Sequence, residues 1–348
     1  MTSTLERSVA SVRQNRARRH QRGHRVTISL GAIVFALFVL TMMVGSYFVS
    51  APAVVKSVLH LTDNPGPDFI VRELRLPRAL AAVCVGLALG VSGTIFQQML
   101  GNPLASPDFI GISSGASVAA VAGIVLFHLG GFQISLSAMV GALASAALIY
   151  LIAWRDGISG YRLILVGIGV SEFLLSIVTY LVARADLYDA REAMHWLVGS
   201  IGQSGNRELI ALVIALIVLL PAALLLNRPL QALELGDDAA RALGSRVELS
   251  RVGLIGVSIT LVAFATAVAG PIAFVALVAG PIARRILGPA SGGILASAFV
   301  GAVIVLGADL VSQHLLPEAL PTGVVTGAVG APYLIWLLAT VNREGRGG

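Results

Sequence analysis

Charged side chains are rare in this chain, and lysine is almost absent. Only 12% of the 348 residues are Asp, Glu, Lys or Arg, and Lys56 is the one lysine, whereas soluble domains are roughly 25% charged. Hydrophobic residues make up 56% of the sequence, and the mean hydropathy is +0.87. They gather in repeated runs of about 20 residues, the length that an α-helix needs to cross a bilayer. The composition therefore predicts an all-α polytopic membrane protein.

The sequence also lacks the residues that disulfides, metal sites, ATP binding and catalysis would need. The single cysteine, Cys84, lies within an apolar run, which excludes an internal disulfide and a cysteine metal cluster. The sequence contains no G-x-x-x-x-G-K-[ST] and no H-E-x-x-H, so it has neither a P-loop for ATP nor that zinc motif. The six histidines are scattered, and they suggest no Ser/His/Asp constellation. We expect no catalytic residue, no metal ligand and no cofactor bound by this chain.

The basic residues need no nucleic-acid partner to explain them, although the isoelectric point is near 10.1. Arginines flank the apolar runs, as expected where positive charge stays on the cytoplasmic side. Seven arginines precede the first run, which is too long for the core of a signal peptide and has no A-x-A site after it. We therefore expect a basic cytoplasmic arm at 1–26, one membrane domain at 27–341 and a cytoplasmic tail at 342–348.

Ten apolar segments could cross the membrane. They are residues 27–50, 78–100, 109–130, 134–154, 161–183, 209–226, 250–270, 272–287, 294–316 and 322–341. Only Gly270 and Pro271 separate the seventh from the eighth, so nine spans is the alternative. With ten spans and both termini in the cytoplasm, 17 basic residues fall inside and seven outside, which favours ten.

The stretch 227–251, between the sixth and seventh segments, holds four arginines and four acids and must project into water. Leu235, Ala239 and Leu243 recur at i, i+4 and i+8 and so share one helical face. Gly236 precedes two aspartates and Gly244 follows, a pattern that starts and ends a short helix. We predict two short helices with a glycine elbow. They could contact another protein or lie on the membrane surface, and composition does not separate these readings.

Within the apolar segments, Glu172 and Asp309 are the acids placed at membrane depth. Ion-coupled transporters keep ionisable groups there. Two isolated acids are a thin basis for that mechanism, but an ion-coupled secondary transporter stays open as the alternative function.

Four stretches, in order, resemble the FecCD family of ABC importer permeases. The pattern L-x-L-G-x-x-x-A-x-x-L-G occupies 233–244, and R-L-P-R-A-L-A-A-V-C-V-G-L-A-L-G begins the match at 75–117. The segments A-G-P-I-A-F-V-A-L-V-A-G-P-I-A-R-R-I-L-G at 269–288 and L-P-T-G-V-V-T-G-A-V-G-A-P-Y at the start of 320–338 follow. Together they cover nearly all of the chain after the arm.

The resemblance implies a permease in a bacterial inner (cell) membrane that carries iron-siderophores, haem or cobalamin. Its partners would be membrane lipid, a second permease as homodimer or heterodimer, an extracytoplasmic binding protein, and a separate ATPase that uses the ATP. By resemblance, the ATPase would contact the stretch 227–251, whose candidate residues are Leu233, Leu235, Gly236, Asp238, Ala239, Leu243 and Gly244.

Two further sites are implied by the same resemblance. In the family, arginines matching Arg75 and Arg78 meet acidic residues of the binding protein; the other reading is that they snorkel to the membrane interface. Ser159, Gly160 and Tyr161 match a family segment near the cytoplasmic gate.

Overall fold

The computed structural model describes residues 2–45, 47–61, 64–154, 160–203, 205–288, 293–315 and 318–344. Within these residues the regular secondary structure is helical, without strands. Each of the ten apolar segments contains one helix, and these helices are α1 (Thr2–Met43), α4 (Leu76–Met99), α5 (Ile112–Phe127), α6 (Phe132–Ala153), α7 (Gly160–Arg184), α9 (Asn206–Leu225), α12 (Val247–Ala269), α13 (Val275–Leu287), α14 (Ile294–His314) and α15 (Thr322–Glu344).

Shorter helices connect them: α2 (Ala51–Val58), α3 (Pro65–Phe69), the π-helical η1 (Ile70–Arg75), the 3₁₀ turn η2 (Pro107–Ile110), α8 (Leu187–Val198), α10 (Asn227–Leu233) and α11 (Asp237–Ala242).

Seven segments of the described chain are long and apolar enough to cross a membrane. They are Gln21–Met43, Pro65–Met99, Phe132–Ala153, Gly160–Arg184, Asn206–Leu225, Val247–Ala269 and Ile294–His314. Helix α13 has 13 residues, about 20 Å at 1.5 Å per residue, which is short of the ~30 Å hydrocarbon layer. The structure thus supports a polytopic membrane protein, and the count of ten crossings stays a prediction.

Two segment ends depart from the sequence prediction. The first helix ends at Met43 rather than continuing to residue 50, and α2 begins after it with a proline in its first turn. At its other end, α1 begins at Thr2 and so runs as one helix through the predicted arm and the first span. In contrast, Gly270 does separate two helices: it has a φ of +68°, and α13 begins only at Val275.

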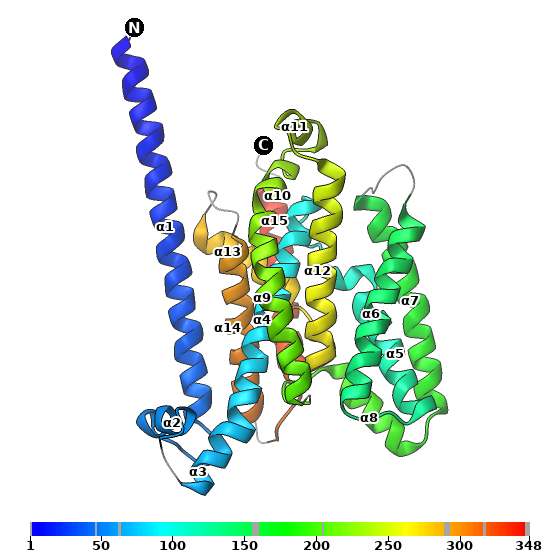
Figure 1. Ribbon diagram of the computed structural model, residues 1–348. Coiled ribbons are helices and arrows are strands. Elements are labelled where there is room, and N and C mark those ends of the chain that lie inside the picture. Colours follow the sequence, from blue (N-terminus) through cyan, green and yellow to red (C-terminus); the bar gives the residue numbers. More distant parts are fainter. Residues whose placement is uncertain are drawn as a thin grey trace.

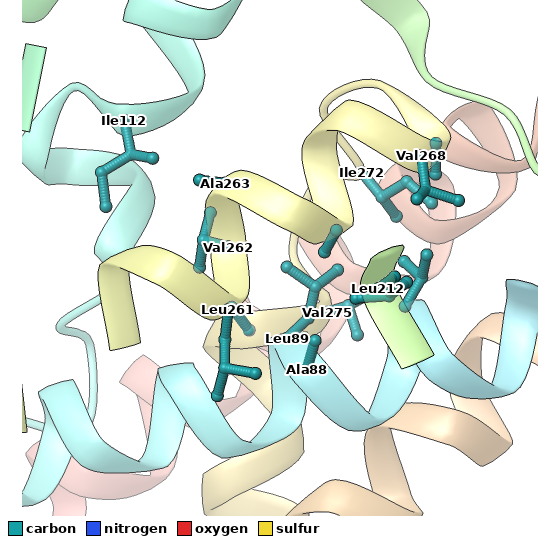
Figure 2. Packing of buried hydrophobic residues seen from close by; sticks show 14 of the residues in the cluster. Ala88, Leu89, Ile112, Leu212, Leu261, Val262, Ala263, Val268, Ile272 and Val275 are labelled. Carbon is teal, nitrogen blue, oxygen red and sulfur yellow. The ribbon is translucent and has the colours of Figure 1, made fainter. Parts of the chain in front are cut away.

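Helix α4 forms the centre of the bundle and packs against α9, α12, α13 and α14. Glycines on one of its faces allow these close approaches. A Cβ added at Gly86 or Gly90 would overlap the backbone of α14, and one added at Gly93 would overlap the carbonyl of Ala276 in α13. Figure 2 shows the apolar core beside this helix, where Ala88 and Leu89 lie near Leu212 and Leu261.

The two ends of the bundle differ in which short helices and chain termini lie there. Both chain termini and α11 lie at one end, while α2, α3 and α8 lie at the other (Figure 1). We call these the α11 end and the α8 end. This arrangement agrees with the predicted sidedness, in which the stretch 227–251 shares a side with both termini.

Candidate functional site

A tip made of α10 and α11 projects from the α11 end (Figure 1). Glycines shape it, since Gly236 with a φ of +95° joins the two helices and Gly244 with a φ of +80° follows α11. Both values lie in the left-handed region that glycine enters without steric cost. Asp237 and Asp238 occupy the first turn of α11, where carboxylates complement the helix dipole.

The tip exposes large apolar side chains. Leu235 is 66% exposed and Leu243 is 67% exposed, whereas Ala239 is half-buried. Leucines exposed this far on a water-facing segment suit a contact with another molecule. Leu233, another of the candidate coupling residues, is buried in the core and anchors α10.

The remaining predicted tip residues are polar or flexible. Gly236 and Gly244 are exposed, and a Cβ at either would meet open space. The carboxylate of Asp238 is fully exposed and accepts a hydrogen bond from Arg241 at 3.0 Å. This pair lies within α11 and so does not attach the tip to the bundle.

An ion pair joins the tip to the bundle, and a second tip carboxylate, that of Glu234, feels the charge of a bundle arginine. The guanidinium of Arg251, in α12, donates to the carboxylate of Asp237 at 2.8 Å. On the other side, Glu234 lies near Arg284 of α13; burial raises the pKa of the Glu234 carboxyl, and the charge of Arg284 offsets part of that rise. Arg284 in turn donates to Gln97 of α4 at 3.1 Å, and Gln97 donates to the carbonyl of Leu277 at 2.7 Å.

At the α8 end, Arg78 forms a buried ion pair that the sequence did not reveal. Its Nη2 and Nε donate to the two carboxylate oxygens of Asp309 at 2.8 Å and 3.0 Å. Asp309 is 1% exposed and also accepts a hydrogen bond from Thr322 at 3.0 Å. Asp309 is therefore not an isolated acid, because Arg78 balances its charge and both Arg78 and Thr322 donate hydrogen bonds to its carboxylate.

Arg75 is also engaged within the chain. Its guanidinium donates to the carbonyls of Met42 and Met43 at 2.9 Å and 3.1 Å, and to that of Tyr47. Both arginines line a cavity of about 730 Å³. Arg75 and Arg78 thus hold α1, α4 and α14 together at this end, and their docking of a binding protein stays a prediction.

The gate candidates lie at the start of α7. Gly160 and Tyr161 begin this helix, while Ser159 lies outside the described residues. Tyr161 is 78% exposed. With Asn102 and Arg251 it lines a cavity of about 380 Å³ at the α11 end.

One face of α7 is left uncovered by the rest of the described chain, and from Gly169 to Ala183 its residues are small or polar. The exposed residues at intervals of three or four are Tyr161, Leu165, Gly169, Glu172, Ser176, Thr179 and Ala183. Glu172 is thus exposed near the middle of a helix that is long enough to cross a membrane. A carboxylate facing lipid at that depth is costly, so this face suits contact with water or protein.

No group of three or more His, Cys, Asp or Glu that could hold a metal occurs among the described residues. The helical bundle with seven membrane-length helices, an exposed charged tip and a polar face on α7 defines a multi-pass membrane protein. The chain belongs to the FecCD transport family, whose model matches residues 33–340.

Individual relatives agree with this assignment. The chain is 46% identical to the ferric enterobactin transport system permease protein FepG of Escherichia coli (strain K12), over 79% of this chain and 84% of that protein. It is 40% identical to the achromobactin transport system permease protein CbrC of Dickeya dadantii (strain 3937), over 90% of each. A solved inward-facing structure of a metal-chelate type ABC transporter superposes with a TM-score of 0.80 at 26% identity, covering 91% of this chain and 99% of the other. The chain is a transport permease.

Proposed function

We propose that this chain is the membrane-spanning subunit of an ABC importer that brings ferric siderophores into a bacterial cell. The observation that carries this proposal is the exposed tip of α10 and α11. The chain has no P-loop sequence, so a motor driven by ATP must be another protein that contacts this one.

The tip has the properties such a contact needs. Leu235 and Leu243 present apolar surface at the α11 end, and the aspartates of α11 surround them with charge. Apolar anchors with a polar rim are typical of specific protein interfaces. A membrane-surface location would instead favour basic residues on the polar face of the helix, and α11 has acids in its first turn.

The α7 face supports a pathway between two copies of the permease. Gly169, Glu172, Ser176 and Thr179 are uncovered in one chain, yet Glu172 is poorly suited to lipid. A second permease across an aqueous pathway would give these side chains a polar environment. Tyr161, at the same face and at the α11 end, would then stand at the cytoplasmic mouth.

Ferric siderophore is the proposed cargo, because the relatives named for enterobactin and achromobactin share so much of this sequence. Haem and cobalamin are the alternatives within the same class of importer. Selectivity would reside mainly in the extracytoplasmic binding protein, since few charged side chains face the α7 pathway.

An ion-coupled transporter needs an ionisable group that can change its charge at membrane depth. Asp309 is a poor candidate, because Arg78 and Thr322 already bind its carboxylate. Glu172 alone would have to serve, which makes this alternative the weaker one.

Reconstitution tests the function directly. The chain is placed in liposomes with the ATPase and binding protein encoded beside it, and uptake of radio-labelled ferric siderophore, haem and cobalamin is measured. We expect uptake of the siderophore that requires ATP and both partner proteins. Uptake by the chain alone under a proton or sodium gradient would overturn the proposal in favour of the ion-coupled alternative.

A further inference from the structure

One ion pair connects the tip to a helix of the bundle. Arg251 Nη2 lies 2.8 Å from Asp237 Oδ1, and the arginine side chain is only 14% exposed. Asp237 is the first residue of α11 and Arg251 belongs to α12. Charge-assisted hydrogen bonds of this length are short and directional, so the pair fixes the start of α11 relative to α12.

The tip needs such an anchor because its backbone alone would not transmit a movement of α11 to the bundle. Helix α11 has six residues and stands between Gly236 and Gly244, both with positive φ. Its neighbours within the described chain are α10 and α12. A push on Leu235 or Leu243 could rotate α11 about these glycines, unless a side chain carries the movement onward.

Arg251 also reaches the region of the predicted gate. The same side chain lines the cavity of about 380 Å³ that Asn102, Gly160 and Tyr161 border. One residue therefore pairs with the tip through Asp237 and lines the cavity at the start of α7.

We propose that Arg251 is a positioning residue for transport: through Asp237 it transmits movement of α11 to the cavity at Gly160 and Tyr161. This inference rests on the proposed contact between α11 and a separate ATPase. A partner can bias two conformations only through a contact that differs between them. The Asp237–Arg251 pair supplies such a contact between the surface that the ATPase would move and the pathway.

The first test replaces Arg251 with Met, which keeps an unbranched apolar stem and removes the guanidinium with its charge. The variant is reconstituted with the ATPase and binding protein, and both ATP hydrolysis and uptake are measured. We expect association with the ATPase and basal hydrolysis to remain. Uptake per ATP should fall by roughly 5- to 150-fold, the usual range of coupling between two sites. Arg251→Lys should recover part of the loss, because it retains the charge.

Glu248 gives a matched control. It lies 3.7 Å from Arg251 but belongs to the same helix, so Glu248→Gln removes an acid partner without cutting the link to α11. We expect it to transport like the unaltered protein. Asp237→Ala removes the acceptor and should reproduce the defect of Arg251→Met, and combining the two should add little, as expected for residues that act as a pair.

Three results would overturn the proposal: normal uptake per ATP in Arg251→Met, an equal defect in Glu248→Gln, or additive losses in the double variant. If Arg251→Met does not fold, Asp237→Ala still decides the question, because Asp237 is 40% exposed. Failure of the proposed function has a different signature, since the ATPase would then not associate even with the unaltered tip.

Discussion

Replacing Arg78 with Met should destabilise the protein more than replacing its partner Asp309 with Asn. The two ends of this ion pair differ in their access to water. Both residues border the cavity of about 730 Å³, but the Asp309 side chain is 2% exposed, whereas that of Arg78 is 27% exposed. Loss of Arg78 therefore leaves a nearly buried carboxylate without its charge partner.

The expected sizes follow from this difference. Removing one partner of a buried ion pair costs about 3–5 kcal/mol, and Arg78→Met should fall in this range, since only Thr322 would still bind Asp309. Asp309→Asn leaves a guanidinium that can turn to the cavity and still donate to the amide oxygen. Its cost should approach that of one hydrogen bond to a charged group, about 1.5–3 kcal/mol.

The double variant Arg78→Met with Asp309→Asn completes the comparison. It removes both charges, so it should be more stable than Arg78→Met alone. Unfolding is followed by tryptophan fluorescence while SDS is titrated into mixed micelles, and helix content is checked by circular dichroism. The reasoning is wrong if Asp309→Asn is the more damaging single change, or if the two losses simply add in the double variant.

Two further predictions concern packing and pH. Gly93→Ala should lower the free energy of unfolding by about 1–3 kcal/mol, the usual cost of overpacking a core, because the new methyl group overlaps the carbonyl of Ala276. Gly256→Ala is the control: its methyl group meets open space, so stability should not change. Micellar unfolding of both variants measures the difference. Glu234→Gln should stabilise the protein at neutral pH, because burial raises the pKa of this carboxyl and its ionised form is then disfavoured in the folded state. The advantage should disappear as pH falls below the ordinary pKa of 4.5, and an advantage that persists at low pH would contradict this cause.

Hydropathy alone located the helices well, because a run of about 20 apolar residues has few other uses. It could not tell that α13 has only 13 residues, since apolar residues continue through the break after Gly270. The end of α1 was also missed, because the residues after Met43 are still mostly apolar.

The sequence likewise predicted one part of the candidate site, the tip, and missed the ion pairs around it. Charge and glycine spacing within 25 residues indicated the tip, since local rules govern a short helix between glycines. The Arg78–Asp309 pair joins residues 231 positions apart, and nothing in a single sequence relates them. Arg251 and Asp237 lie only 14 positions apart, but their contact depends on how α11 folds back on α12, which periodicity does not give.

The tip can be tested most directly by measuring ATPase association and ATP-driven siderophore uptake for Leu235→Asp and Leu243→Asp in the reconstituted importer. A charge on either exposed leucine should abolish both activities while the permease still inserts and folds. Leu315→Asp is the matched control, because Leu315 is 69% exposed and follows α14, which ends far from the tip. We predict that the control binds the ATPase and transports normally. Normal association and uptake in the two tip variants would contradict the assignment of α10 and α11 as the surface through which ATP drives transport.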